Sequence, residues 1–165
     1  TSQALLVSMA KDKCAKTRLT PSKKKLLWRL TNSKANGLPG KLELLIGMPV
    51  MLTTNVAVKL NLTNGSMGTV VDIHYDSTDT IRETNGNILE IEPQCVIVKF
   101  EDTRCPQLPG LQLGEVPVYP TSGSFQFRFP GAKTRYSISR EQIPLVPAYS
   151  YTAHKSQGKY VKENE

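Results

Sequence analysis

Short β-prone runs separated by turn dipeptides fill the chain from Leu38 onward, and this punctuation constrains the fold more than any other feature. The runs are rich in β-branched and aromatic residues, and each ends close to a Gly or Pro pair that favours a turn. They lie at residues 48–54, 67–75, 95–100, 115–120, 124–129 and 134–139. Five or six short strands joined by such turns predict a small antiparallel barrel.

Alternation within the runs supports this interpretation. In VVDIHY the apolar residues alternate with Asp72, His74 and Asp76, and in FQFRF three phenylalanines alternate with Gln126 and Arg128. A period of two places one set on a buried face and the other in water. We therefore expect His74 on the solvent side, as a structural residue, because no pattern of metal ligands surrounds it.

Glycines in the same region have an expected structural role. Small barrels need residues without a Cβ where curved strands approach one another or where the chain turns sharply. We expect Gly47, Gly65 and Gly68 to serve there.

The chain before Leu38 is polar, and residues 1–20 show no apolar period, so no structure is predicted for them. Pro21 and Ser22 can begin a short helix, which Asn36-Gly37 would end. We expect Trp28 to pack against the protein, with stacking on a nucleic-acid base as the alternative. One face of this helix carries Leu26, Leu27 and Leu30.

Charge is divided unevenly along the sequence. Residues 1–41 hold ten Lys and Arg against one acid, residues 42–127 hold four against ten, and residues 128–165 hold seven against three. If the protein binds a polyanion, phosphate attraction should come from the two basic flanks. The alternative is that the lysines at 23–25 form only a solvated helix face.

Several classes of protein do not fit the composition. Three cysteines, Cys14, Cys95 and Cys105, are too few and too irregularly spaced for a disulfide framework or a four-ligand zinc site. No apolar run approaches the roughly 20 residues that cross a bilayer, and no signal-peptide pattern begins the sequence. We expect an intracellular protein with no membrane partner.

The last segment differs from the others. Ile143 to Tyr151 is almost continuously apolar and aromatic, which is typical of a strand buried in a parallel sheet. Thr152 and Ala153 then lead into HKSQG, as at a strand end that passes into a helix, where anionic ligands collect. A phosphate could be held by Thr152, His154 and Lys155. The alternative is a capped helix whose polar residues are only solvated.

Two blocks of sequence resemble one family. LPGKLELLIGMPVMLTTNVAVKLNLTNGSMGTVVDI, residues 38–73, is similar to a segment of PIF-type (petite integration frequency), RecD-like superfamily 1 DNA helicases and their Helitron relatives. Further on, AYSYTAHKSQG at 148–158 resembles that family's helicase motif V, and REQIPL at 140–145 resembles the block that precedes motif V. The resemblance covers roughly residues 38–158.

The resemblance implies an organisation. Such helicases have two RecA-like motor domains, and the second carries an inserted SH3-like barrel, the 2B domain, just ahead of motif V. The chain is then expected to be mainly β. It would comprise a basic, partly helical segment from the motor or a linker (1–41), an SH3-like 2B barrel (42–140), and the truncated strand–helix start of a RecA-like α/β domain (141–165).

The resemblance also implies roles for individual residues. Thr152, His154 and Lys155 would contact single-stranded DNA, while Gln157 and Gly158 would shape the turn facing the motor interface and couple it to DNA. Arg140 and Gln142 are expected to give structural support.

The sequence departs from an intact helicase in its nucleotide site. No G-x-x-x-x-G-K-[ST] occurs, and no strand ends in an acidic pair that would hold magnesium. Tyr160-Val161 stands where the family has Thr-Leu. We therefore expect a helicase fragment that binds no cofactor and hydrolyses no ATP alone, while ATP and Mg²⁺ would act in the intact parent with the missing motor domains.

Family members serve in DNA repair, recombination, telomere maintenance and transposition, so a nuclear or mitochondrial location is expected in a eukaryote. Two other classes stay open. One is a stand-alone SH3-like module that binds nucleic acid or protein, since small barrels have many functions. The other is an enzyme using His154 with a Cys or Ser nucleophile, although no acid is placed to orient that histidine.

Overall fold

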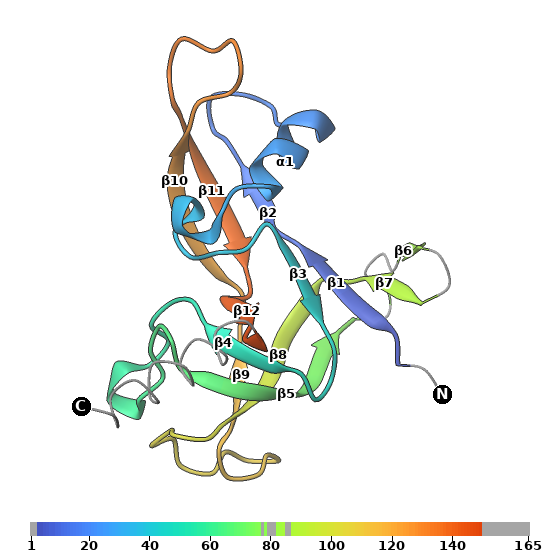
Figure 1. Cartoon of the computed structure of the whole chain (residues 1–165), viewed down its shortest axis with the longest axis vertical. Helices are drawn as coiled ribbons and strands as arrows, with labels where there is room; N and C mark the ends of the chain where they lie inside the picture. Colours follow the sequence, from blue (N-terminus) through green and yellow to red (C-terminus); the bar gives the residue numbers. More distant parts are fainter. Residues whose placement is uncertain (1–2, 77, 79–81, 85–86, 150–165) are drawn as a thin grey trace, which may run out of the picture.

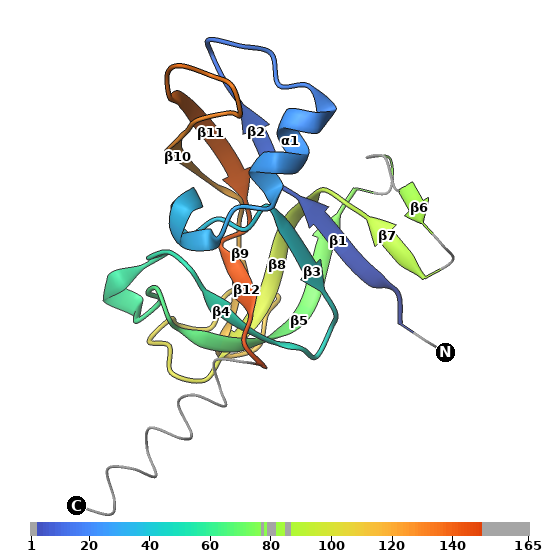
Figure 2. The same ribbon diagram turned by 45° about the horizontal axis from the view of Figure 1, so that its top comes forward.

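The chain folds into two joined lobes, each built around its own hydrophobic cluster (Figures 1 and 2). The computed structural model describes residues 3–76, 78, 82–84 and 87–149. The helices are α1 (Pro21–Trp28) and the 3-10 turns η1 (Asn32–Ala35) and η2 (Val58–Leu60). The strands are β1 (Leu5–Met9), β2 (Lys11–Lys13), β3 (Lys41–Leu44), β4 (Pro49–Leu52), β5 (Met67–Tyr75), β6 (Arg82–Thr84), β7 (Ile88–Glu90), β8 (Pro93–Phe100), β9 (Glu115–Val118), β10 (Thr121–Phe127), β11 (Tyr136–Gln142) and β12 (Leu145–Pro147).

A five-stranded antiparallel sheet forms the centre of the larger lobe, in the order β12-β4-β5-β8-β9. Its longest pair, β5 with β8, shifts register between Val70 and Asp72, and such a bulge bends a sheet and increases its twist. The predicted mainly β, antiparallel fold is confirmed. Hydrogen bonds between the described strands leave this sheet open, with β12 and β9 at its two ends.

The alternation predicted for β5 is confirmed. Ile73 is buried and Val71 and Tyr75 are partly buried, whereas Asp72, His74 and Asp76 are exposed. Val70 is buried as well, three positions before Ile73, because the bulge between Val70 and Asp72 shifts the alternation. Gly68 also has its expected role, because a Cβ there would lie 2.6 Å from the carbonyl oxygen of Lys99 on β8. Apolar side chains of this sheet form one cluster with Leu44 of β3, which belongs to a second sheet of the same lobe. The cluster includes Leu44, Val50, Leu52, Val70, Val96, Val98, Phe100, Ile143 and Leu145.

A second sheet, ordered β3-β1-β7-β6, packs in the same lobe. Strand β1 pairs antiparallel with β3 and parallel with β7. The sequence predicted no structure for residues 1–20. Strands β1 and β2 were not predicted, because their hydrogen-bonding partners lie far away in the chain and because LLVSM, the sequence of β1, has no clean alternation.

The smaller lobe lies at the upper end of Figure 1 and contains the sheet β10-β11-β2 with α1. The predicted helix is present, with the Thr20 side chain as its N-cap and Pro21 in its first turn. The core of this smaller lobe consists of Leu27, Ala35, Phe125, Phe129 and Ile138. We call this part, residues 11–35 and 121–142, the basic lobe, and the rest the β lobe.

The predicted parallel-sheet strand over residues 143–151 is wrong where the structure describes it. Leu145–Pro147 forms β12, an antiparallel edge strand in which Leu145 lies opposite Leu52 of β4. The apolar run is buried because Ile143 and Leu145 complete the core of the β lobe, and not because helices cover two faces of a parallel sheet. Residues 150–165 lie outside the described residues.

The sheets also cross the predicted segment boundaries. Strand β1 pairs with β3 across the boundary after Lys41, and β11 runs from Tyr136 to Gln142, through the boundary at residues 140 and 141.

Candidate nucleic-acid interface

The motif residues singled out in the sequence, Thr152, His154, Lys155, Gln157 and Gly158, all lie outside the described residues. Their roles stay predictions. The candidate interface is therefore built here from the basic lobe, which the structure does describe.

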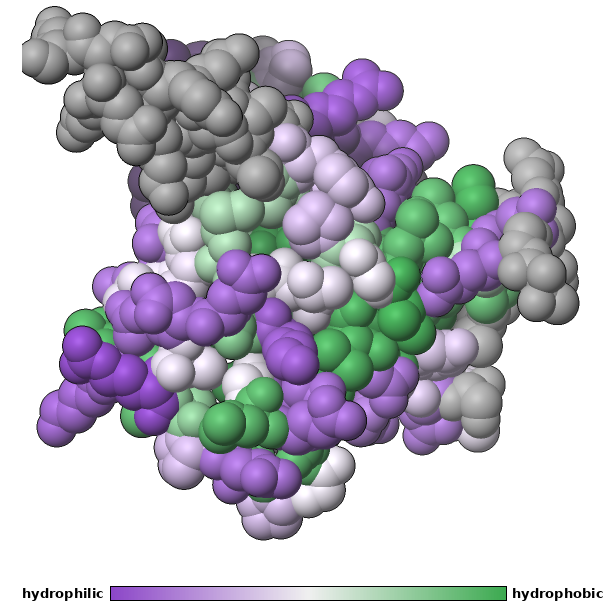
Figure 3. Space-filling model, turned by 60° about the horizontal axis from the view of Figure 1, so that its bottom comes forward, coloured by the Kyte–Doolittle hydropathy of each residue, from purple (hydrophilic) through white to green (hydrophobic). Residues whose placement is uncertain are grey.

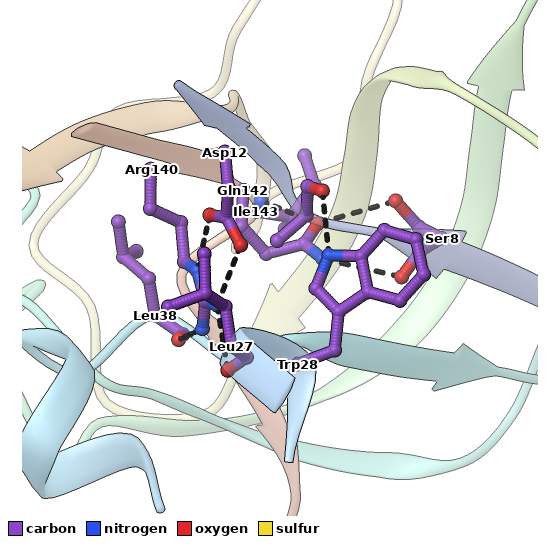
Figure 4. Close-up of polar contacts among 9 residues, drawn as sticks. Ser8, Asp12, Leu27, Trp28, Leu38, Arg140, Gln142 and Ile143 are labelled. Atoms are coloured by element: carbon purple, nitrogen blue, oxygen red, sulfur yellow. Dashed lines mark hydrogen bonds and ion pairs between the residues drawn. The ribbon is translucent and has the colours of Figure 1, made fainter. Parts of the chain in front are cut away.

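Arg140 on β11 holds the basic lobe together (Figure 4). Its Nε and Nη2 atoms donate to the two carboxylate oxygens of Asp12 on β2, at 2.7 and 2.8 Å. Nη1 donates to the carbonyl of Leu38 at 3.1 Å, and Nη2 also donates to the carbonyl of Leu27 at 2.9 Å. Both charged side chains are fully buried, so this ion pair belongs to the core and not to the surface.

Neighbouring polar contacts extend this network to β1 and α1. Ser8 Oγ donates to Gln142 Oε1 at 3.2 Å, and the Gln142 amide donates to the Ser8 carbonyl at 3.2 Å. Trp28 donates its ring N–H to the Ala10 carbonyl at 3.0 Å. The structural roles predicted for Arg140 and Gln142 are confirmed, and Trp28 packs against the protein as expected.

The network has an electrostatic consequence for the surface. The basic lobe, residues 11–35 and 121–142, holds thirteen Lys and Arg against only two acids, Asp12 and Glu141. Asp12 is buried against Arg140, so it does not offset the charge of the surface lysines. The two basic flanks of the sequence thus meet in one lobe. Its exposed or partly exposed cations are Lys11, which pairs with Glu92, and Lys13, Lys16, Arg18, Lys23, Lys24, Lys25, Arg29, Lys34, Arg128, Lys133 and Arg135.

A hollow opens between β2, the segment that follows it, and the start of α1. Its wall contains three cations, Lys13, Arg18 and Lys24, together with the hydroxyl-bearing residues Thr17 and Thr20. In the described part of the chain, none of the three cations forms an ion pair with an acid. Ammonium, guanidinium and hydroxyl groups together suit a phosphate.

Sequence reasoning located the basic flanks but did not single out these three cations. The only sequence signal was the local excess of charge. The hollow itself arises from the pairing of β2 with β11, which the pattern of residues 1–20 did not predict.

The β lobe shows little that resembles catalytic chemistry. Burial, and next the negative charge of Asp72, raise the pKa of the Cys95 thiol, which disfavours the reactive thiolate. Cys105 is buried as well. His74 is exposed and lies 3.0 Å from Asp72 Oδ2. Among the described residues no group of three or more His, Cys, Asp and Glu could hold a metal ion.

The β lobe differs from the basic lobe in its exposed surface. Figure 3 shows one face of the molecule, with hydrophobic areas separated by hydrophilic side chains. Six of the seven large hydrophobic residues exposed in the described chain lie in the β lobe; they are Ile46, Val56, Val58, Leu113, Tyr119 and Tyr149. None of the described helices is long and apolar enough to span a bilayer.

Comparison with known proteins gave matches among solved structures only. No family model matches the sequence, and no curated protein matches it. The chain is similar to the Pif1 helicase from Candida albicans, with 21% identity and a TM-score of 0.49, over 90% of this chain and 30% of that one. It is also similar to unliganded Pif1 from Bacteroides sp., with 13% identity and a TM-score of 0.46, over 89% of this chain and 25% of that one. Both proteins are Pif1 helicases, and the chain spans less than a third of the length of either.

Proposed function

We propose that the chain is part of a PIF-type DNA helicase and that it binds single-stranded DNA through the basic lobe. One observation carries the binding proposal: the fold brings two basic flanks, far apart in sequence, into one lobe and buries the acid Asp12 of that lobe. Lys and Arg that neutralise backbone phosphates release counterions, which drives binding without sequence preference. The parentage rests on the two motif blocks at 38–73 and 140–158.

The residues after the basic lobe complete this proposal. Thr152, His154 and Lys155 would contact the DNA backbone, and Gln157 and Gly158 would shape the turn that faces the motor. ATP and Mg²⁺ would act in the RecA-like motor domains of the whole helicase. The exposed apolar side chains of the β lobe suit those motor domains as protein partners. A role in DNA metabolism in the nucleus or a mitochondrion follows from this parentage.

The alternative is a stand-alone SH3-like interaction module, which the same exposed apolar side chains favour. The two proposals differ over motif V, residues 148–158: the helicase proposal needs its side chains for DNA binding, and the interaction module does not. Removal of residues 144–165 would not separate them, because β12 belongs to the five-stranded sheet. Substitution of His154 and Lys155 by alanine leaves that sheet whole, and only the helicase proposal expects weaker binding of single-stranded DNA.

The experiment measures the affinity of the full chain for a single-stranded oligonucleotide at several salt concentrations. One variant replaces Lys13, Arg18 and Lys24 with glutamine, and a matched variant replaces three exposed cations of the β lobe, Lys59, Lys99 and Arg104. Each phosphate contact contributes about 0.7 to the slope of log K against log salt for single strands. Loss of three contacts should lower the slope by about 2, whereas the matched variant should keep most of the slope.

Equal effects of the two triple variants would show that net charge alone, and not the basic lobe, governs binding. A slope near zero for the unmodified chain would overturn the nucleic-acid proposal itself. Circular dichroism of each variant shows whether its fold is intact.

A further inference from the structure

We propose that Thr20 is a phosphorylation site for a proline-directed serine/threonine kinase, and that its phosphate would occupy the basic hollow and weaken DNA binding there. The sequence at this point is Thr20-Pro21-Ser22-Lys23. Proline-directed kinases require a proline directly after the acceptor, and the cyclin-dependent group also prefers Lys or Arg two residues after that proline. Thr20-Pro21 is the only Ser/Thr-Pro pair in the sequence.

The local structure makes the acceptor accessible. Thr20 is exposed and has an extended backbone, with φ −69° and ψ 160°. Residues 14–20 form neither helix nor strand, and kinases bind extended substrates. For Thr20 to enter a kinase, only the first turn of α1 must unfold. That turn has no buried side chain, since the first buried residue of the helix is Leu27, so its local unfolding costs little free energy.

The chemistry is that of an ordinary kinase. The Thr20 hydroxyl oxygen forms a bond to the γ-phosphorus of ATP, and the bond from that phosphorus to the β,γ-bridging oxygen breaks. ADP leaves with the bonding electron pair, and the hydroxyl proton passes to the kinase's catalytic carboxylate. The kinase supplies ATP and Mg²⁺, so nothing further is needed from this chain.

The surroundings of Thr20 would hold the new phosphate. Its side chain already accepts a hydrogen bond from the Lys23 backbone N–H at 3.4 Å, at the positive end of α1. Thr20 lines the same hollow as Lys13, Arg18 and Lys24. Lys23 is also near, with its ammonium 3.4 Å from Thr17 Oγ1. A phosphate carrying about −1.5 to −2 charges would therefore pair with cations that we assign to DNA.

The first test concerns modification alone. The folded full chain is incubated with a cyclin-dependent kinase, ATP and Mg²⁺, and phosphate is located by peptide mass spectrometry. We expect one phosphate, on Thr20, in the unmodified chain and in the Ser22→Ala control. Thr20→Ala should take none, and Thr20→Ser, which keeps both hydroxyl and cap, should restore it. No phosphate in the folded chain, or phosphate elsewhere with Thr20 unmodified, would overturn the proposal.

The second test concerns the effect on DNA and rests on the proposed function. Phosphorylated and unmodified chains are compared in the salt titration with single-stranded oligonucleotide. Cancellation of about two charges should lower the slope by about 1 and weaken binding about tenfold at 0.1 M salt. An unchanged slope would overturn the blocking role. If the unmodified chain fails to bind DNA, the proposed function fails, while the mass measurement still decides whether Thr20 is modified.

Discussion

Arg140 shows how a charge can be kept in the core of a small protein. Burial of a guanidinium is costly unless its N–H groups find acceptors, and here Asp12, Leu27 and Leu38 provide them. The guanidinium carbon also lies 5.1 Å from the centre of the Phe125 ring. Arg140 thereby ties β11 to β2, to the end of α1 and to the chain ahead of β3.

Arg140→Met should strongly destabilise the protein. It leaves the Asp12 carboxylate and the Leu38 carbonyl without the donors that Arg140 provides, while the Leu27 carbonyl keeps the backbone N–H of Leu30. Breaking a buried ion pair in this way costs about 3–5 kcal/mol. Urea denaturation followed by circular dichroism measures the loss. The matched control is Arg135→Met, an exposed arginine just ahead of β11, which should change the free energy of unfolding by less than about 0.5 kcal/mol.

A second substitution tests the cause of that loss. Addition of Asp12→Leu to Arg140→Met removes the unpaired carboxylate, so the double variant should recover part of the lost stability. If Arg140→Met costs less than about 1 kcal/mol, the network does not hold the lobe together as we describe.

The supporting role of Arg140 was predictable from the motif that carries it, but its partner was not. Asp12 precedes it by 128 residues and lies in a segment with no readable period. A single sequence does not show which acid will neutralise a buried cation, because that choice depends on strand pairing.

At the scale of elements, α1 and the start of β3 approach each other very closely. A Cβ on Gly40 would lie 2.4 Å from both the Cα and the carbonyl oxygen of Trp28. Backbone cannot move aside as a flexible side chain can, so only glycine fits this crossing without displacement of α1.

Gly40→Ala should therefore destabilise the chain by about 1–3 kcal/mol or more, the range expected for an overpacked site. Gly123→Ala is the matched control, since its Cβ would meet the flexible Asn36 side-chain nitrogen at 2.8 Å and this group can shift. Urea denaturation compares the two variants. A larger loss for Gly123→Ala than for Gly40→Ala would contradict the close approach of α1 and β3.

The elements divide into those that the sequence predicted and those that it did not. Strands β4, β5, β8, β9, β10 and β11 each overlap a predicted β-prone run, because turns and alternation are local signals. Strands β1, β2, β3, β6 and β7 overlap none of these runs, and β1 and β2 depend on distant partners. Strand β12 was predicted in a parallel sheet because a short apolar run looks the same in either setting.

At the scale of the whole molecule, the fold separates charge into regions. Residues 36–120 hold five basic residues against ten acidic ones, whereas the basic lobe carries the excess of Lys and Arg. The basic lobe depends on both flanks of the chain, because β2 comes from the first and β11 from the second. A polyanion should therefore bind at one end of the molecule, and its binding should require β2 of the first flank to be paired with β11 of the second.

A division of the chain after Lys41 tests this dependence. The fragment 42–165 lacks β1, which pairs with β3 and β7, and β2, which pairs with β11. It would also expose the buried Leu42 and Leu44 of β3. We expect no cooperative urea transition and little dispersion of backbone amide NMR signals from this fragment.

Addition of the separate segment 1–41 should restore the fold, since β1 and β2 would then pair with strands that remain in the fragment. The matched control segment carries Val7→Asp, which places a charge at a buried position of β1 and should prevent restoration. If the fragment 42–165 instead unfolds cooperatively with the midpoint of the full chain, the first 41 residues are an appendage. The basic lobe would then not depend on both flanks, and the view that cations of the two flanks form one binding surface for a polyanion would be wrong.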